Sequence, residues 1–96
     1  MTPIEKGYSE ACERVNRAVE KSLTKHGAQF DSNLFLRLAI ITEEIGECAH
    51  AAMNLYFGDN DAQTVHDHEE ELFAEIADVA ASAKLVLAQL LGELRK

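Results

Sequence analysis

Residues 34–57 read LFLRLAIITEEIGECAHAAMNLYF, and this stretch decides the fold. Apolar residues recur in it at alternating spacings of four and three, which is the period of a helix that packs along a seam. This pattern predicts one long helix that ends at Phe57, with Asp31 or Ser32 as its N-cap and Gly58 as its stop. The seam consists of Leu34, Leu38, Ile41, Ile45, Cys48, Ala52 and Leu55.

The segments on either side of this stretch have the same helical period. Residues 2–5 read TPIE, which combines an N-cap residue, a proline at the first helical position and a glutamate three residues after the cap. A first helix is therefore predicted from Pro3 to about Lys25, and a third from about Ala62 to Leu94. Their apolar seams are Ile4, Tyr8, Cys12, Val15, Val19 and Leu23, and Leu72, Ile76, Val79, Ala83, Val86 and Leu90.

The middle helix carries a second apolar stripe, which includes Leu36, Ile40 and Ala51. A helix with so wide an apolar surface needs partners on more than one side, and three helices in one chain can hardly cover it. The sequence therefore predicts an all-α fold in which residues 1–96 form a single domain. Long antiparallel helices would form a helical bundle completed by oligomerisation, at least as a homodimer.

Composition excludes several classes of partner. The net charge is −8 and no cluster of Lys or Arg is present, which argues against nucleic-acid binding and against docking on anionic membranes. No run approaches the length of a membrane span, and the first residues lack the apolar core of a signal peptide, so we expect a cytoplasmic location. Cys12 and Cys48 form no Cys-x-x-Cys pair and are predicted to be buried, reduced thiols.

Two acidic hexapeptides repeat one pattern in the second and third predicted helices. Residues 44–49 read EIGECA and residues 75–80 read EIADVA: acid, Ile, small, acid, apolar, Ala. Residues three apart lie on one face of a helix, so each hexapeptide presents two carboxylates side by side. Packing the two helices together would place four carboxylates around one point, where a hard divalent cation is the natural counter-charge. The four are Glu44, Glu47, Glu75 and Asp78.

Other interpretations of these residues stay open. The chain has 17 acidic residues among 96, so pairs three apart also arise by chance on a solvated helix face. Residues 69–71 read EEE, which is typical of a solvated first helical turn. Glu47-x-x-His50 is an element of di-iron bundles, but only one is present where two are needed. A non-catalytic helical-bundle interaction module and a carboxylate-bridged di-iron or di-manganese bundle are therefore the alternatives.

The pattern EExxE at residues 43–47, followed by ExxD at residues 75–78, resembles the MazG-like all-alpha nucleoside triphosphate pyrophosphohydrolases. Residues 38–49 and 75–80 are also similar to that family, and the resemblance covers roughly residues 34–92. It implies cleavage of a (d)NTP to (d)NMP and pyrophosphate with Mg²⁺, for which Mn²⁺ can substitute, in nucleotide-pool housekeeping. The implied assembly is a dimer or a dimer of dimers, with the site completed by a neighbouring subunit. The implied metal ligands are Glu44, Glu47, Glu75 and Asp78.

The resemblance also suggests catalytic and substrate-binding residues. Glu43 is a candidate for the base, or for a residue that supports a metal ligand, so the catalytic candidates are Glu43, Glu44 and Glu47. Relatives often place base-contacting residues where this chain has Phe30, Ser32 and Asn33, although core or cap roles are an alternative for each. Arg37 and Lys84 are candidates for phosphate contacts, with surface salt bridges as the alternative. The spacer from Glu47 to Glu75 is near the long end of the family range, and base preference stays open.

Overall fold

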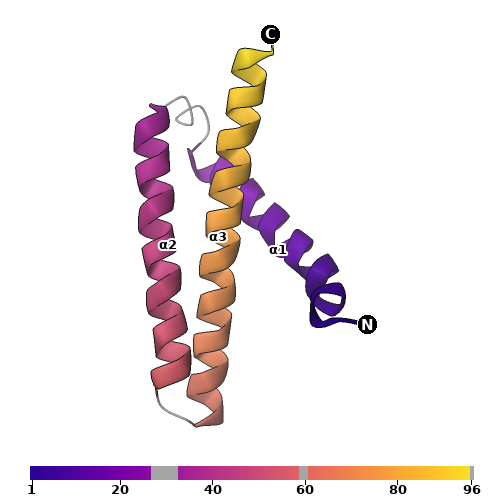
Figure 1. The fold of residues 1–96 in the computed structure, drawn as a ribbon, viewed down its shortest axis with the longest axis vertical. Coiled ribbons are helices and arrows are strands. Elements are labelled where there is room, and N and C mark those ends of the chain that lie inside the picture. Colours follow the sequence, from indigo (N-terminus) through magenta and orange to yellow (C-terminus); the bar gives the residue numbers. More distant parts are fainter. Residues whose placement is uncertain (27–32, 59–60, 96) are drawn as a thin grey trace.

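The computed structural model describes residues 1–26, 33–58 and 61–95, and this part of the chain forms three α-helices with no strand. They are α1 (Pro3–His26), α2 (Leu34–Phe57) and α3 (Ala62–Leu94). α2 and α3 lie side by side and antiparallel, while α1 crosses the other side of α3 at an angle (Figure 1). The prediction of an all-α chain with long antiparallel helices is confirmed. Its completion by oligomerisation stays a prediction.

The ends of α1 and α2 are set by local hydrogen bonds. The Glu5 N–H donates to Thr2 Oγ1, and the Thr2 N–H donates to Glu5 Oε1, each at 3.2 Å, which forms the predicted capping box. α2 is capped by Asn33, whose side chain accepts a hydrogen bond from the Phe35 N–H at 2.8 Å. The prediction of Asp31 or Ser32 as the cap is therefore wrong, and both lie outside the described residues. At the other end α2 stops before Gly58, as predicted.

α3 begins several residues before the acidic run at residues 69–71, so that run does not form its first turn. Asp61 is its N-cap and accepts a hydrogen bond from the Thr64 N–H at 3.1 Å. The acidic run therefore lies inside the helix, beyond the reach of the N-terminal dipole, which corrects its assignment to a solvated first turn. One member, Glu70, instead pairs with Arg14 of α1 at 3.2 Å.

The register of α2 against α3 repeats every seven residues. Arg37 donates a hydrogen bond to Gln89, and the Ser82 hydroxyl donates to Glu44 at 2.8 Å. Residues 37 and 44 are seven apart along α2, and their partners, residues 89 and 82, are seven apart along α3 in the opposite direction. This is the spacing of an antiparallel coiled pair.

On α2 the buried line is rotated from the predicted seam, whereas Val86 of the seam predicted for the third helix is buried as expected. Within the part of the chain that the structure describes, the buried apolar residues are small or medium in size: Ala51, Ala77, Ala81 and Val86. The predicted seam residue Ile45 is 54% exposed, whereas Ala51 is 1% exposed. The reason is that the line of residues 37, 44 and 51, also spaced by seven, faces α3, and two of its three members are charged. A pattern of apolar residues alone does not detect such a seam.

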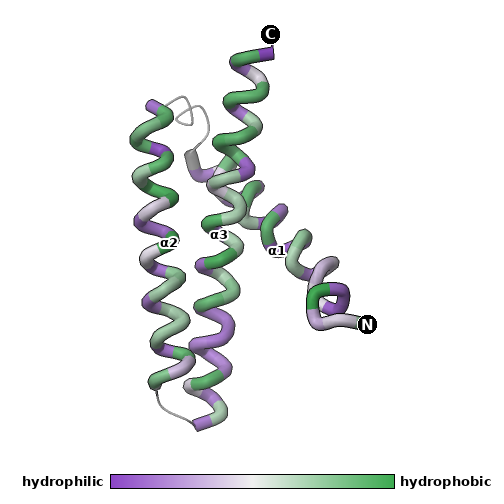
Figure 2. The backbone as a smooth tube through the Cα atoms, in the orientation of Figure 1, coloured by the Kyte–Doolittle hydropathy of each residue, from purple (hydrophilic) through white to green (hydrophobic). Residues whose placement is uncertain are grey.

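Much apolar surface remains uncovered in the single chain. Its accessible area is 7,311 Å², against about 5,500 Å² for a compact monomer of this mass. Its radius of gyration is 15.5 Å, against about 12.5 Å. Figure 2 shows hydrophobic residues along α2 and along the upper part of α3. Cys12 is exposed on α1, which corrects its assignment as a buried thiol, and Cys48 is half-buried. Among the described residues, no helix is both long and apolar enough to span a bilayer.

Candidate functional site

The four carboxylates singled out in the sequence lie near one another on the α2–α3 pair, close enough for their charges to interact, but they do not converge on one point. Glu44 and Glu47 come from α2, and Glu75 and Asp78 come from α3. The negative charges of Asp78 and Glu47 help to raise the pKa of Glu44, and those of Glu47 and Asp78 help to raise the pKa of Glu75. Carboxylates influence one another in this way only at short range. The antiparallel register therefore gathers both acidic pairs into one cluster.

Glu44 is the member of this cluster held most firmly. Its partial burial raises the pKa of its carboxyl group, and the nearby charges of Asp78 and Glu47 raise it further. The hydrogen bond from the Ser82 hydroxyl to Glu44 Oε1, at 2.8 Å, acts in the opposite direction because it stabilises the charged form. One oxygen of Glu44 is thus fixed by α3, and its orientation is set before any ligand arrives.

Glu75 is the second residue of the cluster whose carboxyl pKa is raised. Partial burial is the largest cause of its raised pKa, followed by a hydrogen bond with the Glu47 side chain and by the charge of Glu47. The charges of Asp78 and Glu71 raise the pKa further. A proton or a cation between Glu75 and Glu47 would relieve this repulsion.

The Cys48 thiol lies among the four carboxylates. Burial raises the pKa of Cys48, and the charges of Glu75, Glu44, Asp78 and Glu47 add to the shift. A thiol with a raised pKa stays protonated at neutral pH and is a poor nucleophile. Cys48 therefore acts in the packing of the α2–α3 pair, and the chemistry of the cluster belongs to the carboxylates.

A surface hollow of about 370 Å³ opens beside the cluster. Its lining includes Glu43 and His50, which brings both residues to the same place as Glu47 and Glu75. It also includes Glu71, which was assigned from the sequence to a solvated turn. A hollow lined by four carboxylates and one imidazole is a strongly anionic cavity, suited to a cation or to a ligand that carries one.

The donor atoms of this cluster are of the type that hard divalent cations prefer. They are carboxylate oxygens, the ligand type that Mg²⁺ prefers. Across residues 1–26, 33–58 and 61–95, no three side chains of His, Cys, Asp or Glu are arranged so that they could already hold one metal ion. Mg²⁺ in phosphate-handling sites is commonly bound through one or two carboxylates plus waters and substrate phosphates. A cluster of carboxylates in which the pKa values of Glu44 and Glu75 are raised therefore fits such an ion without a closed protein cage.

The candidate phosphate-binding residues lie away from this hollow. Arg37 is 7% exposed, and its hydrogen bond to Gln89 places it in the interface between α2 and α3. Lys84 donates a hydrogen bond to Asn16 of α1 at 3.1 Å. Because Lys84 lies two positions after Ser82, it points about 200° away from the side of α3 that meets Glu44. The structure of this chain therefore does not bring Lys84 together with the carboxylates.

Asn33 is placed as a helix cap, and Phe30 and Ser32 lie outside the described residues. We expect Asn33→Ala to lower the free energy of unfolding by about 1 kcal/mol, because the Phe35 N–H loses its acceptor. Asn33→Ser should retain stability, because serine also caps helices. Urea denaturation followed by circular dichroism measures both. An Asn33→Ala chain as stable as the wild type, but with a higher KM for substrate, would instead support the base-contact assignment.

Two residues of the site were missed in the sequence, Ser82 and Glu71. Both could have been found from the seven-residue period of the interface. Ser82 lies seven residues after Glu75, and Glu71 lies four residues before it, so all three share one side of α3. Once the register is known, a hydroxyl and an additional carboxylate on the same side of the helix as a proposed metal ligand can be predicted to belong to the site.

No protein-family model, no curated protein and no solved structure matches this chain. The carboxylate cluster, the register that forms it and its electrostatics are therefore the features that point to a function for this chain.

Proposed function

We propose that this chain is a Mg²⁺-dependent nucleoside triphosphate pyrophosphohydrolase, which converts a (d)NTP to the monophosphate and pyrophosphate. One observation carries the proposal: two acidic pairs from matching hexapeptides meet across antiparallel helices and raise the pKa of Glu44 and Glu75. Four anions kept together in this way are destabilising unless a ligand is bound between them. A magnesium–triphosphate complex supplies both the cation and a substrate.

In this proposal the metal binds through one or two carboxylates drawn from Glu44, Glu47, Glu75 and Asp78, and waters and the triphosphate complete its coordination. The bound ion would supply charge neutralisation for the phosphates and would lower the pKa of a coordinated water. The Ser82 hydroxyl fixes one oxygen of Glu44 and thereby orients the carboxylate, whose remaining lone pairs can bind the ligand.

Glu43 is the proposed base. Its side chain lines the hollow next to Glu47, but it lies further round the helix than the metal-binding line of Glu44 and Glu47. A carboxylate in that position can take a proton from a water held near the triphosphate. Water then adds across the bond between the α- and β-phosphates, the monophosphate takes up the hydroxyl oxygen, and pyrophosphate leaves with the bridging oxygen.

The proposal is tested by turnover. We expect the protein to release pyrophosphate and a nucleoside monophosphate in equal amounts from at least one member of a panel of NTPs and dNTPs. The reaction should require Mg²⁺ or Mn²⁺ and should stop in excess chelator. Chromatography of the nucleotide and a coupled assay for pyrophosphate follow the two products. Release of orthophosphate with a nucleoside diphosphate, or no turnover with any nucleotide, would count against the proposal.

A carboxylate-bridged di-metal bundle is the second candidate, because His50 lines the same hollow as Glu47. It predicts a coloured or redox-active metal and a protein that needs His50. In the proposed pyrophosphohydrolase His50→Ala should retain most of the activity. The third interpretation, a non-catalytic interaction module, predicts that Glu44→Ala and Asp78→Ala barely change the affinity for metal.

A further inference from the structure

A glycine inside α2 forms part of the wall of the acidic hollow. Gly46 lines this hollow together with Glu43, Glu47 and His50 of the same helix. Unlike those three residues it has no side chain, so the hollow reaches the helix backbone at this position. Gly46 lies in the interior of a 24-residue helix, where glycine lowers stability relative to alanine.

The packing of the described chain does not require glycine at residue 46. A Cβ atom built there meets nothing within 4 Å beyond its chain neighbours and the backbone of its own helical turn. Gly58 differs, because a Cβ atom there would clash with the carbonyl oxygen of Asn54. Alanine at residue 46 would therefore fit without a clash and would favour the helix. Its absence points to something outside the chain that approaches the backbone of α2 closely.

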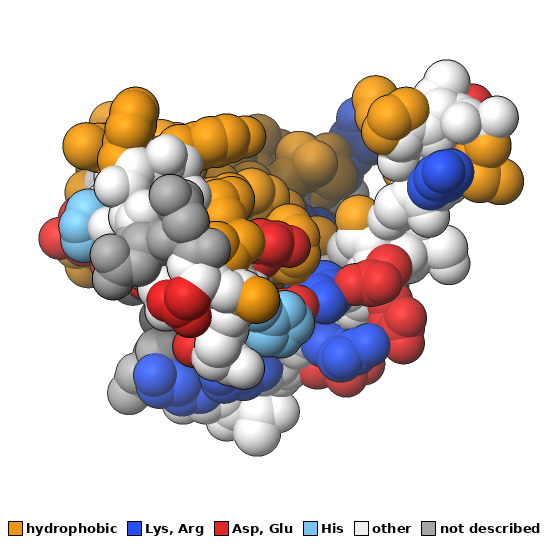
Figure 3. Space-filling view, turned by 90° about the horizontal axis from the view of Figure 1, so that it is seen from below, with side chains coloured by type: hydrophobic (Ala, Val, Ile, Leu, Met, Phe, Trp, Pro, Cys, Tyr) orange, Lys and Arg blue, Asp and Glu red, His pale blue; other side chains and the backbone are white. Residues whose placement is uncertain are grey.

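The hollow suits a small molecule better than a second protein surface. Its volume of about 370 Å³ is within the range of about 300–1,000 Å³ that is typical of small-molecule sites. Its walls carry four carboxylates, which repel another copy of a chain with a net charge of −8. Figure 3 shows hydrophobic side chains gathered on one side of the molecule and charged side chains on another. A partner that needs apolar contacts therefore has a better surface elsewhere.

The lining residues of α2 follow one another around the helix in a definite order. Successive helical residues are turned by about 100°, so Gly46 lies about 60° from Glu43, and Glu47 lies about 40° beyond Glu43 in the same direction. Glu43, the proposed base, therefore lies between Gly46 and the candidate metal ligand Glu47.

This order matches the order of the groups in a nucleoside triphosphate. Glu47 and Glu75 both line the hollow, so a metal held there keeps its phosphates at their end of it. In the proposed reaction water attacks the α-phosphate, which therefore lies near Glu43. The nucleoside is attached to the other side of the α-phosphate and extends from Glu43 towards Gly46. It is uncharged, and its hydroxyl and amino groups can donate hydrogen bonds to carboxylates, which phosphate oxygens cannot do.

We infer that Gly46 is the position at which the nucleoside part of the substrate crosses α2. This inference rests on the proposed function and adds to it where the nucleoside binds. The missing side chain leaves room for the sugar or the base against the helix backbone. A side chain at residue 46 would lean over the preceding turn, which contains Glu43, and would occupy the space where the nucleoside begins. Gly46 is thus a specificity-determining residue and takes no part in the chemistry.

Two substitutions test whether stability and substrate binding change in opposite directions. Gly46→Ala should raise the melting temperature in chelator by about 2–8 °C, because alanine favours the helix. It should nevertheless raise the KM for the (d)NTP that the wild type turns over fastest. Gly46→Leu adds a larger side chain that also favours helices, and it should raise the KM by about 10-fold or more. A purely structural role does not predict weaker substrate binding by a more stable protein.

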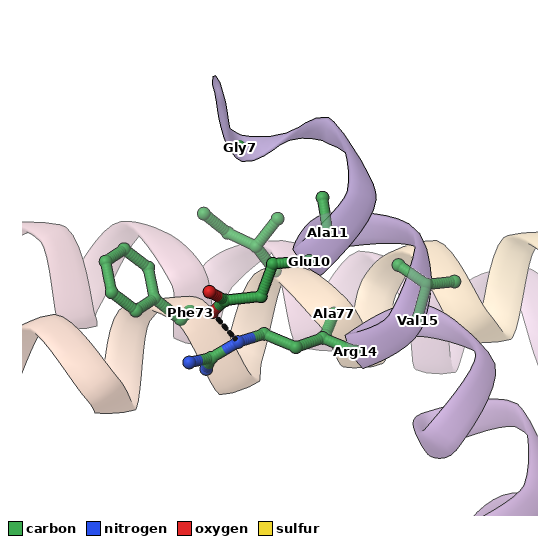
Figure 4. A pocket seen from close by; sticks show the side chains of 8 residues that line it. Gly7, Glu10, Ala11, Arg14, Val15, Phe73 and Ala77 are labelled. Carbon is green, nitrogen blue, oxygen red and sulfur yellow. Dashed lines mark hydrogen bonds and ion pairs between the residues drawn. The ribbon is translucent and has the colours of Figure 1, made fainter. Parts of the chain in front are cut away.

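Gly7→Ala is the matched control. Gly7 also lies within a helix, and a Cβ atom built there meets nothing within 4 Å. It lines a different cavity, an apolar groove of about 430 Å³ between α1 and α3 (Figure 4). Among the described residues, this groove and the acidic hollow have no lining residue in common. Gly7→Ala should therefore raise the melting temperature in the same way, with the KM within about two-fold of the wild type.

The two products separate the phosphate end of the hollow from the nucleoside end. Isothermal titration calorimetry with Mg²⁺ and pyrophosphate should give dissociation constants within about two-fold of each other for the wild type and Gly46→Leu. The nucleoside monophosphate should bind Gly46→Leu more weakly by about 10-fold or more. Equal weakening of both products, or an unchanged affinity for the monophosphate, would overturn the inference.

Failure of this inference can be told from failure of the proposed function. A wild type that turns over no nucleotide would overturn both. A wild type that releases pyrophosphate, together with a Gly46→Leu variant of unchanged KM, would overturn only the role of Gly46. Circular dichroism checks that each variant keeps its helices. If Gly46→Leu loses helicity, Gly46→Ala decides the matter, because its KM must then rise while that of Gly7→Ala does not.

Discussion

Replacing Glu47 with glutamine is expected to abolish pyrophosphate release, with kcat/KM lowered by at least about 100-fold. Glu47 lines the acidic hollow, and it interacts with Glu75 across the interface and with Glu44 along α2. It is therefore the carboxylate that connects the two acidic pairs. The amide of glutamine keeps the size of the side chain but removes the negative charge that binds a cation. Initial rates at saturating Mg²⁺, with the nucleotide that the wild type turns over fastest, measure the effect.

Glu69→Gln is the matched control for this substitution. It removes the same charge from a helix of the same pair, and Glu69 does not line the hollow. Its activity should stay within about two-fold of the wild type, since distant surface charges act weakly through salt. Comparable losses in Glu47→Gln and Glu69→Gln would show that net charge matters and that no localised site exists. Full activity in Glu47→Gln would remove the carboxylate cluster from the mechanism.

The helix boundaries were predictable because short-range chemistry sets them. The box formed by Thr2 and Glu5 can be seen in four consecutive residues, and Gly58 interrupts the helical pattern of α2 in the same local way. The cap of α2 was misplaced because three consecutive residues, Asp31, Ser32 and Asn33, are all good caps. Propensity does not choose among them, and the choice falls to the tertiary position at which the helix begins to pack.

The side on which α2 packs against α3 was harder to predict than the presence of the helices. Periodicity identified Ile45 as a seam residue, yet α3 packs against the line of Arg37, Glu44 and Ala51. Burying Arg37 and part of Glu44 is favourable only because Gln89 and Ser82 stand opposite them, one seven-residue step apart. Such polar pairing is a property of two helices together, so a one-dimensional count of apolar residues misses it.

The carboxylate cluster was predictable because its signal is repeated. Either acidic pair alone would have been read as a solvated helix face, but matching hexapeptides on two neighbouring helices implied a shared location. The electrostatics bear out their proximity, since Asp78 and Glu47 both raise the pKa of Glu44. The repeat did not predict the hydrogen bond from Ser82, because Ser82 lies outside both hexapeptides and the matching position after the first hexapeptide is Ala51.

Without metal, Glu47→Gln is expected to melt at a higher temperature than the wild type at pH 7. Burial and the interaction with Glu47 raise the pKa of Glu75, so the folded chain binds a proton at Glu75 more tightly than the unfolded chain does. Stability therefore falls as pH rises from the ordinary glutamate value of 4.5 through the raised pKa, and at neutral pH the full repulsion is present. Glutamine removes the like charge and can donate an N–H to Glu75. For a partly exposed pair this amounts to at most about 1 kcal/mol, or about 4–8 °C in a chain of this size.

The pH dependence of the melting temperature distinguishes relief of the repulsion between Glu47 and Glu75 from a general gain in packing. Lowering the pH from 7 to 5 in chelator should raise the melting temperature of the wild type relative to that of Glu47→Gln. Protonation removes the repulsion between Glu47 and Glu75 in the wild type, whereas the substitution has already removed it in the variant. Exposed caps such as Asp61, whose hydrogen bond to Thr64 lowers its pKa, act in the opposite direction but equally in both chains, so they cancel in the comparison. Saturating Mg²⁺ should then stabilise the wild type by about 2.7 kcal/mol at 100 times its dissociation constant, and Glu47→Gln much less. A variant that melts below the wild type in chelator at pH 7 would mean that Glu47 stabilises the fold, and that the four carboxylates are not held together against their mutual repulsion.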